Sequence, residues 1–252
     1  MSIARMRTVP PSRAMVCDIL RYDRKVPTCA HDRYFDLSEV VAARARAGVR
    51  ISWPAIFMKA YVLNAARFPK LRQTWMSFPW PHLYEHPKHV GTLVMHRVFE
   101  DDDWLFWVRL NDLGSRSLVE ITQEIHRNQT EPAEKLFKRQ VWMSKLPSPL
   151  RRLCWWMTFQ LSGSKKCKRL GTFFLTTISG KGAEIQEPPS ILTSGFTYGP
   201  VDEQGKCRVT ISYDHRLMDG HHVADILGGF EQTMQVEMLA ELRSLEQSQA
   251  AA

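Results

Sequence analysis

The chain has 252 residues, of which 44% are apolar and 24% are charged, a balance that is ordinary for a folded globular protein. The length fits one substantial domain, and the composition argues against disorder over most of the chain. No run of about 18 apolar residues occurs, and the arginines near the N-terminus are not followed by an apolar segment, which excludes a membrane-spanning helix and argues against a secretory signal. Five scattered cysteines without a CxxC pair fit a reducing compartment, so we expect a cytoplasmic protein.

The net charge of +8 is concentrated in one segment. Between residues 135 and 169 there are ten lysines or arginines and no acidic residue, whereas the rest of the chain is nearly balanced. The same segment contains several tryptophans and leucines. The charge therefore marks a local surface rather than a uniformly basic protein.

Two helices are predicted in the first quarter of the chain. Apolar residues recur every three or four positions over residues 37–47, which predicts an amphipathic helix. Ser52, followed by Pro54, provides a cap and a first-turn proline for a second helix that ends near Pro69. Its apolar residues cover a wide face, so we expect this helix to be largely buried.

The middle of the chain predicts a hairpin followed by a helix. Residues 92–99 and 104–110 are rich in β-branched and aromatic side chains, and they flank the acidic residues 100–103. A solvated turn is favoured there over a metal site, because no histidine or further carboxylate cluster accompanies it. Ser117 and Glu120 form a capping-box pattern that begins an amphipathic helix.

Strand-forming residues return at 172–178, 191–198 and 207–213, with glycines and prolines between them. The last helix is predicted over residues 221–242, where one face is apolar. This order of elements predicts the α/β class, as an α+β two-layer sandwich whose mixed sheet carries helices on one face.

The segment best suited to chemistry is a strand that ends in a histidine and passes through a glycine turn into the last helix. Residues 208–220 read RVTISYDHRLMDG and place His215 at the strand end. Such a position is rigid on one side and open on the other, so an imidazole can be held within hydrogen-bonding reach of a substrate proton. From its position alone, a histidine here is more often structural than catalytic.

This segment resembles the HRxxDG signature of the 2-oxo-acid dehydrogenase acyltransferases, and the residues after it are similar to the DGFHVA continuation of chloramphenicol acetyltransferases. Upstream, residues 171–180 (GTFFLTTISG) are similar to the family's GTFTISNLG strand, and residues 188–195 (PPSILTSG) to its NPPxxAILGVG strand. The likeness spans residues 13–242 in order, although only the histidine motif is specific on its own. It implies a chloramphenicol acetyltransferase-like fold.

The resemblance implies direct transfer of an acyl group from a thioester, with coenzyme A as co-substrate and His215 as the general base. An imidazole with its ordinary pKa is neutral near pH 7 and can accept a proton. The family also places a Ser or Thr hydroxyl against the tetrahedral oxyanion. Anchoring the comparison on Gly171 selects Thr176, whereas anchoring it on Gly180 selects Thr177. Only one can face the site, because neighbours on a strand point to opposite faces, and we slightly prefer Thr176.

Three further residues support the histidine in this interpretation. Asp219 resembles a family position that holds the turn by pairing with an arginine, and Arg13 is its implied partner. Gly220 permits tight backbone geometry beside the site. His221 and His222 are adjacent on a helix and diverge, with no cysteine or carboxylate at ligand spacing, so no metal site is expected.

We interpret residues 1–12 as an N-terminal arm, 13–242 as an acyltransferase catalytic domain with a basic aromatic insertion at 135–170, and 243–252 as a disordered tail. No lipoyl-bearing domain precedes the family-like region, so we expect no lipoyl attachment in this chain. The insertion has three interpretations: a covering helix that packs within a homotrimer, a dock for an acyl carrier protein or acyl chain, or a contact with anionic membrane.

Three classes of function are therefore considered. The leading hypothesis is a free-standing acyltransferase that acts as a homotrimer on acyl-CoA and a thiol, hydroxyl or amine acceptor. The alternative is a catalytically degenerate trimeric scaffold or ligand-binding module. Nucleic acid is not an expected partner, because no recognised nucleic-acid-binding module accompanies the basic segment.

Overall fold

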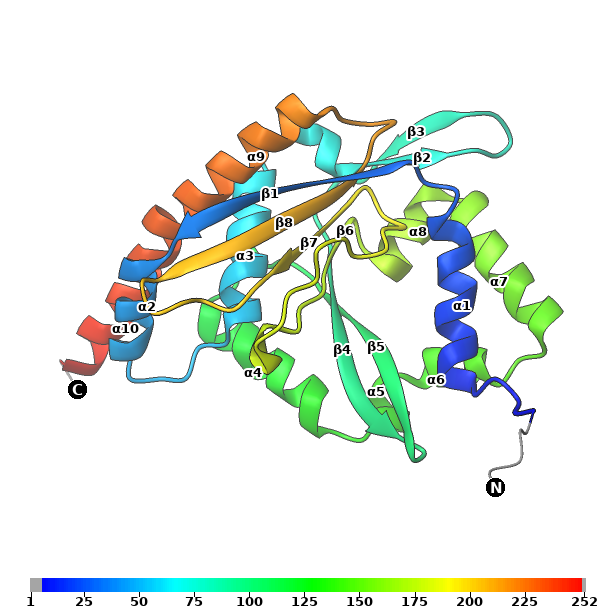
Figure 1. Cartoon of the computed structure of the whole chain (residues 1–252), viewed down its shortest axis with the longest axis horizontal. Coiled ribbons are helices and arrows are strands. Elements are labelled where there is room, and N and C mark those ends of the chain that lie inside the picture. Colours follow the sequence, from blue (N-terminus) through cyan, green and yellow to red (C-terminus); the bar gives the residue numbers. More distant parts are fainter. Residues whose placement is uncertain (1–5, 251–252) are drawn as a thin grey trace, which may run out of the picture.

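A computed structural model of the chain describes residues 6–250, and its centre is a six-stranded sheet in the order β1-β8-β7-β6-β4-β5 (Figure 1). The pairs β4–β6 and β6–β7 are parallel and the other neighbours are antiparallel, which confirms the expected mixed sheet. Its strands are β1 (Thr28–Asp36), β4 (Gly91–Phe99), β5 (Asp102–Leu110), β6 (Phe173–Leu175), β7 (Ser194–Tyr198) and β8 (Lys206–Asp214). A separate hairpin pairs β2 (Gln73–Met76) with β3 (His82–Glu85).

One face of the sheet, called here the inner face, is covered by a helical layer. Its helices are α2 (Ser38–Arg46), α3 (Trp53–Ala65), α4 (Leu118–Thr130), α9 (Gly220–Thr233) and α10 (Leu239–Ala250), with a π-helical turn, η3 (Met234–Met238), joining the last two. Aromatic rings fill the space beneath them: Phe57 of α3 stacks on Tyr198 of β7 at a centroid distance of 4.0 Å, and Tyr61 stacks on Phe196 at 4.8 Å. Such pairs add to the area-dependent gain from burial, so this face is the main source of stability.

Local signals explain the ends of these elements. The Ser52 side chain accepts a hydrogen bond from the Ala55 N–H at the start of α3, and Ser117 and Glu120 form both bonds of the expected capping box on α4. The acidic turn between β4 and β5 is a two-residue loop in which Glu100 and Asp101 both have positive φ. That geometry matches the twist of an antiparallel hairpin.

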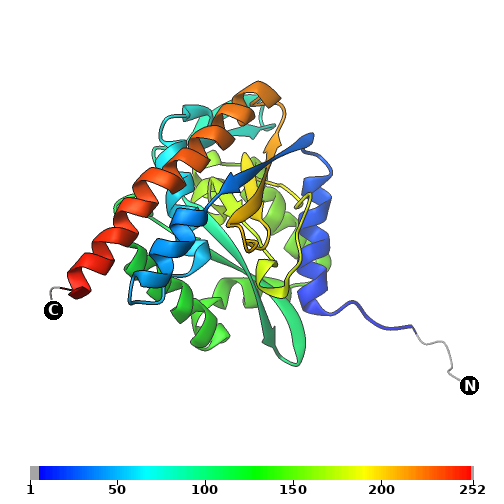
Figure 2. The same ribbon diagram turned by 60° about the vertical axis from the view of Figure 1, so that its left-hand side comes forward.

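On the opposite, outer face, helices cover the end of the sheet formed by β6, β4 and β5. There α1 (Pro11–Asp23) packs beside α6 (Lys138–Ser144), α7 (Ser148–Gln160) and α8 (Gly163–Leu170), while a short helix, α5 (Ala133–Leu136), leads into them. Figure 2 shows α1 on one side of the sheet and the continuous α9–α10 rod on the other. The basic insertion at 135–170 therefore adds a partial third layer to the expected sandwich. A buried ion pair between Arg151 and Asp18 ties α7 to α1.

The C-terminal segment corrects one expectation. Residues 243–252 were expected to be disordered, but α10 continues to Ala250, and residues 251–252 lie outside the described part. The reason is packing against α2: Leu242 is fully buried, and Arg46 pairs with Glu246 at 2.9 Å while Arg243 pairs with Glu39 at 3.0 Å. At the other end α1 begins at Pro11, within the expected arm. No helix in residues 6–250 is long and apolar enough to cross a lipid bilayer.

Candidate functional site

His215 follows the last residue of β8, in a turn of residues 214–220 that we call the His215 turn. Its backbone N–H donates to the carbonyl oxygen of Pro27 at 2.9 Å, and the Asp214 N–H donates to that of Thr193 at 3.0 Å. The His215 side chain remains 46% exposed. The backbone is therefore held on both sides while the imidazole stays accessible.

A buried carboxylate organises this turn. Asp214 is 4% exposed, and its two oxygens accept hydrogen bonds from the Arg216 backbone N–H at 3.0 Å, from Nε at 2.8 Å and from Nη2 at 2.6 Å. The guanidinium of Arg216 lies 5.0 Å above the ring of Trp75 in β2. A two-pronged Arg–carboxylate pair fixes geometry more strongly than a single bond does. The role of Asp214 and Arg216 was not predicted from the sequence, although these two residues flank His215 directly.

The expected Arg13–Asp219 pair does not form within the chain. The side chain of Asp219 is 72% exposed, and its Oδ1 lies 3.6 Å from Nδ1 of His215, a contact longer than a hydrogen bond. Arg13 lies in the first turn of α1, where its neighbour Ser12 donates a hydrogen bond to Asp102 at the tip of the β4–β5 hairpin. The His215 turn lies at the other end of α1 (Figure 1), so the length of that helix separates the two residues.

Gly220 allows close packing behind the histidine. A Cβ at this position would lie 3.0 Å from Nε2 of His31, so a larger residue would press on that ring. His31 in turn packs against Tyr213 at a ring distance of 5.6 Å, and Tyr213 lies 5.8 Å from His215. The glycine thus permits a layer of rings behind the site, as expected for tight geometry there.

The two candidate threonines follow the end of β6 and have different surroundings. The Thr177 hydroxyl donates to the carbonyl oxygen of Tyr198 at 2.8 Å and accepts from the Ser179 N–H at 3.1 Å, so its hydrogen bonds are used internally. Thr176 is half-buried and lines a cavity on the outer face. Of the two threonines, Thr176 is the one that lines a space that could hold a ligand.

This cavity, called here the apolar pocket, has a volume of about 150 Å³. It lies between α1, the sheet and the loop before β7, and its walls include Ile19, Val94, Phe174 and Ile191. Walls of this kind suit hydrocarbon rather than charge. The pocket could therefore hold an apolar group beside the Thr176 hydroxyl.

The strand register shows that His215 and Thr176 lie far apart within one chain. Leu175 pairs with Phe196, and Phe196 with Ile211. Because β8 runs antiparallel to β7 and β6, the direction along β8 that leads to His215 leads away from Thr176 along β6. At about 3.3 Å per residue the two side chains are separated by about 16 Å along the strands, and by about 10 Å across two strand spacings. One chain therefore does not bring these groups to the same reacting atom.

His221 and His222 have local contacts of another kind. Nε2 of His221 lies 3.8 Å from Asp225, and Nε2 of His222 lies 3.2 Å from the Lys70 ammonium. Within residues 6–250, no group of three or more His, Cys, Asp or Glu side chains could hold a metal ion. Neither histidine is thus part of a ligand cluster in the described chain.

No protein-family model matches the chain, and no curated protein matches its sequence significantly. Solved structures do match. The dihydrolipoamide acetyltransferase of Azotobacter vinelandii, studied for the catalytic role of a serine, a histidine and an asparagine, is 15% identical, with a TM-score of 0.63 over 96% of this chain and 94% of that one. A truncated catalytic core of the 2-oxoacid dehydrogenase multienzyme complex from Thermoplasma acidophilum is 14% identical, with a TM-score of 0.65 over 94% and 99%.

A chloramphenicol acetyltransferase is also similar, at 11% identity and a TM-score of 0.50 over 86% of this chain and 94% of that one. At identities this low, the structural similarity establishes the shared fold alone. It agrees with the mixed sheet and its helical layer. The chain has the chloramphenicol acetyltransferase-like fold.

Proposed function

We propose that this protein is a cytoplasmic acyltransferase in which His215 is the general base. An acyl group would pass from a thioester of coenzyme A or of a carrier protein to a thiol, hydroxyl or amine acceptor. The observation that carries the proposal is the His215 turn: an accessible imidazole at a strand end, held by Asp214 and Arg216, on a fold shared with acetyltransferases.

The geometry supports specific roles for the two ring nitrogens. Nδ1 of His215 is on the side of Asp219, which leaves Nε2 for the acceptor. A neutral imidazole would take the acceptor's proton as the new bond to the acyl carbon forms, and it would return that proton to the leaving thiolate. General-base help of this kind contributes about 10²–10⁴ in rate.

The tetrahedral intermediate needs a hydrogen-bond donor for its oxyanion, and Thr176 is the candidate in this chain. Thr176 lines the apolar pocket, whereas the hydroxyl of Thr177 is bonded to Tyr198 and Ser179. A preorganised donor contributes about 10²–10³ in rate. The related Azotobacter vinelandii enzyme was studied for a serine and a histidine, which is consistent with a hydroxyl and an imidazole acting together.

We further propose a homotrimer in which each site combines His215 of one subunit with Thr176 of the next. The large separation of these groups within one chain supports this arrangement, because a hydroxyl and a base must both lie within about 3 Å of the reacting atoms. Closing the two half-sites against each other would also exclude water and strengthen the oxyanion contact.

The experiment is an assay of thiol release from a panel of acyl-CoAs with amine, alcohol and carrier-protein acceptors. The His215→Ala variant should lose about 10²–10⁴ in rate while keeping its melting temperature, since the side chain contributes chemistry and little packing. His221→Ala is the matched control, because that histidine is 87% exposed and lies outside the base's contacts. Activity of His215→Ala within about threefold of wild type would contradict the assignment.

A further inference from the structure

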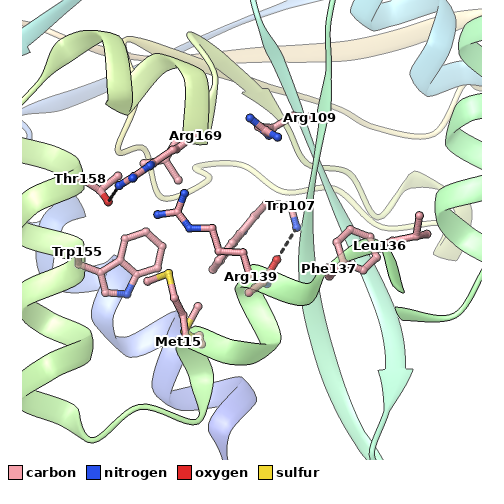
Figure 3. Close-up of a pocket in the computed structure, with 12 residues that line it drawn as sticks. Met15, Trp107, Arg109, Leu136, Phe137, Arg139, Trp155, Thr158 and Arg169 are labelled. Carbon is pink, nitrogen blue, oxygen red and sulfur yellow. Dashed lines mark hydrogen bonds between the residues drawn. The ribbon is translucent and has the colours of Figure 1, made fainter. Parts of the chain in front are cut away.

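A second cavity opens on the outer face, where β5 meets the basic insertion (Figure 3). We call it the arginine pocket. Its volume is about 170 Å³, and it is bounded by β5, α1 and the helices α6, α7 and α8. Three of the residues that line it are Arg109 of β5, Arg139 of α6 and Arg169 of α8. Neither the acyltransfer chemistry nor the His215 turn accounts for this concentration of charge.

The guanidinium groups have few internal partners. Arg109 donates to the backbone carbonyl of Lys168, and Arg169 donates to the Thr158 hydroxyl at 3.1 Å. Arg139 makes no side-chain hydrogen bond in the described part of the chain, and no Asp or Glu of that part lines the pocket. Figure 3 shows Arg139 and Arg169 extending into the same space, with Arg109 on the β5 side.

This arrangement is electrostatically unfavourable when the pocket holds only solvent. All three side chains are exposed to solvent at one side of the pocket, and partial burial of the Arg139 guanidinium, together with the nearby charges of Arg169 and Arg109, lowers the pKa of Arg139. Three like charges around one small space repel one another, and an anion placed between them would relieve the repulsion. The pocket is thus suited to an anionic ligand.

The walls of the pocket are aromatic and are held rigidly. Trp107 and Trp155 meet edge to face with a centroid distance of 5.9 Å, and Trp155 is 3% exposed. Gln140 fixes α6 to the edge strand, because its Oε1 accepts from the Trp107 N–H at 3.2 Å and its Nε2 donates to the Leu105 carbonyl at 2.6 Å. A ligand would therefore meet an apolar wall whose backbone is held in place.

We propose that the arginine pocket binds a small organic phosphate, with its phosphate among Arg109, Arg139 and Arg169 and its apolar part against Trp107 and Trp155. Guanidinium forks match phosphate oxygens with two parallel hydrogen bonds, which favours phosphate over a spherical anion. The proposal stands independently of acyl transfer. Trp107 and Leu170 also line the apolar pocket, so the bound phosphate lies beside the cavity that contains Thr176.

The test is titration calorimetry at constant ionic strength with three probes: inorganic phosphate, adenosine 3′,5′-bisphosphate and a short alkyl phosphate. The pocket should bind at least one organic phosphate about tenfold or more tightly than inorganic phosphate. Tighter binding of the bisphosphate would indicate a nucleotide ligand, and tighter binding of the alkyl phosphate would indicate a lipid-like ligand. If both bind no better than inorganic phosphate, the apolar part of the proposal is wrong.

Arg139→Gln should weaken binding about tenfold or more, as expected for loss of a charged hydrogen-bond donor. Lys138→Gln is the matched control, since it removes the same charge from the neighbouring α6 residue, which does not line the pocket. Equal weakening in the two variants would show general charge attraction and overturn the site.

A second measurement is the melting temperature in chloride buffer without phosphate. Added phosphate should then raise the melting temperature of the wild type more than that of Arg139→Gln, because the variant binds it more weakly. The same phosphate stabilisation in both proteins would contradict the proposal.

Discussion

The two halves of the candidate site are built in different ways. The His215 turn is fixed within the chain by the Pro27 carbonyl, the buried Asp214 carboxylate and Arg216 above Trp75. Thr176, by contrast, lies in the wall of a cavity. The proposed base is thus positioned by contacts made on folding, whereas the proposed oxyanion donor would need a ligand and a second surface to complete its surroundings.

Stability and chemistry are therefore expected to be coupled at the His215 turn and separate at Thr176. Changes beneath His215 should alter folding and rate together, because the same bonds hold the turn and aim the imidazole. Changes at Thr176 should alter rate with little effect on folding.

The Asp214→Asn substitution should have the largest effect on stability. It removes the carboxylate charge from a pair in which Asp214 is buried, and loss of one partner from a buried pair costs about 3–5 kcal/mol. Because the Arg216 side chain is 27% exposed, we expect the lower end of that range. Chemical denaturation would measure the loss.

The control for Asp214→Asn is Asp32→Asn, which breaks an exposed pair with Arg208 and should cost less than about 1 kcal/mol. Similar losses in both variants would show that burial of Asp214 does not stabilise the turn.

Lys166 of α8 tests whether the basic insertion supports the His215 turn. Its ammonium donates to the Thr74 hydroxyl at 2.7 Å, next to Trp75, and burial lowers its pKa from 10.5 to about 8. The unfolded chain therefore binds more protons between pH 8 and 10.5, and wild-type stability should rise with pH in this window. The Lys166→Met variant should lack this rise, which amounts to about 3 kcal/mol.

Denaturation of both proteins across that pH range would check the difference, with the exposed Lys165→Met as the control. Parallel stability curves for wild type and Lys166→Met would show that the ammonium is not desolvated. A loss of acyl transfer in Lys166→Met at pH 7 would show that the basic insertion also affects the activity of His215.

The smallest effect is expected for Asp219→Asn. The carboxylate is 72% exposed and lies 3.6 Å from the imidazole, so its removal should cost less than about 1 kcal/mol of stability. A large fall in the melting temperature would instead show that Asp219 holds the turn, as the resemblance first suggested.

Much of the inner face could be predicted from the sequence because its signals are local. The Ser52 cap, the capping box of Ser117 and Glu120, and the alternation of β4 and β5 each involve neighbouring residues. The strand predicted over residues 172–178 is shorter in the structure, however. Strand β6 ends at Leu175, and the chain leaves the sheet where Thr177 bonds to Tyr198. Strand β1 was missed because this edge strand is mostly exposed and has no apolar alternation.

The site could be predicted only in part, because only some of its features follow from local sequence signals. His215 and the threonine pair follow from short motifs, and the structure places the first at a strand end and Thr176 at a cavity. The Arg13–Asp219 pair was wrong because it depends on how far α1 extends across the sheet, which no local pattern encodes. Both pockets also combine segments that are distant in sequence, so the meeting of Arg109 with Arg139 and Arg169 required the fold.

The central claim, a site shared between subunits, is tested most directly by complementation. His215→Ala and Thr176→Val subunits, each inactive alone, are unfolded together, refolded and assayed for thiol release, with co-assembly checked by mass. Random trimers would contain about a quarter of sites with both groups intact, so about that fraction of wild-type activity should return. Thr177→Val alone should stay active. A co-assembled mixture without activity would contradict the shared site.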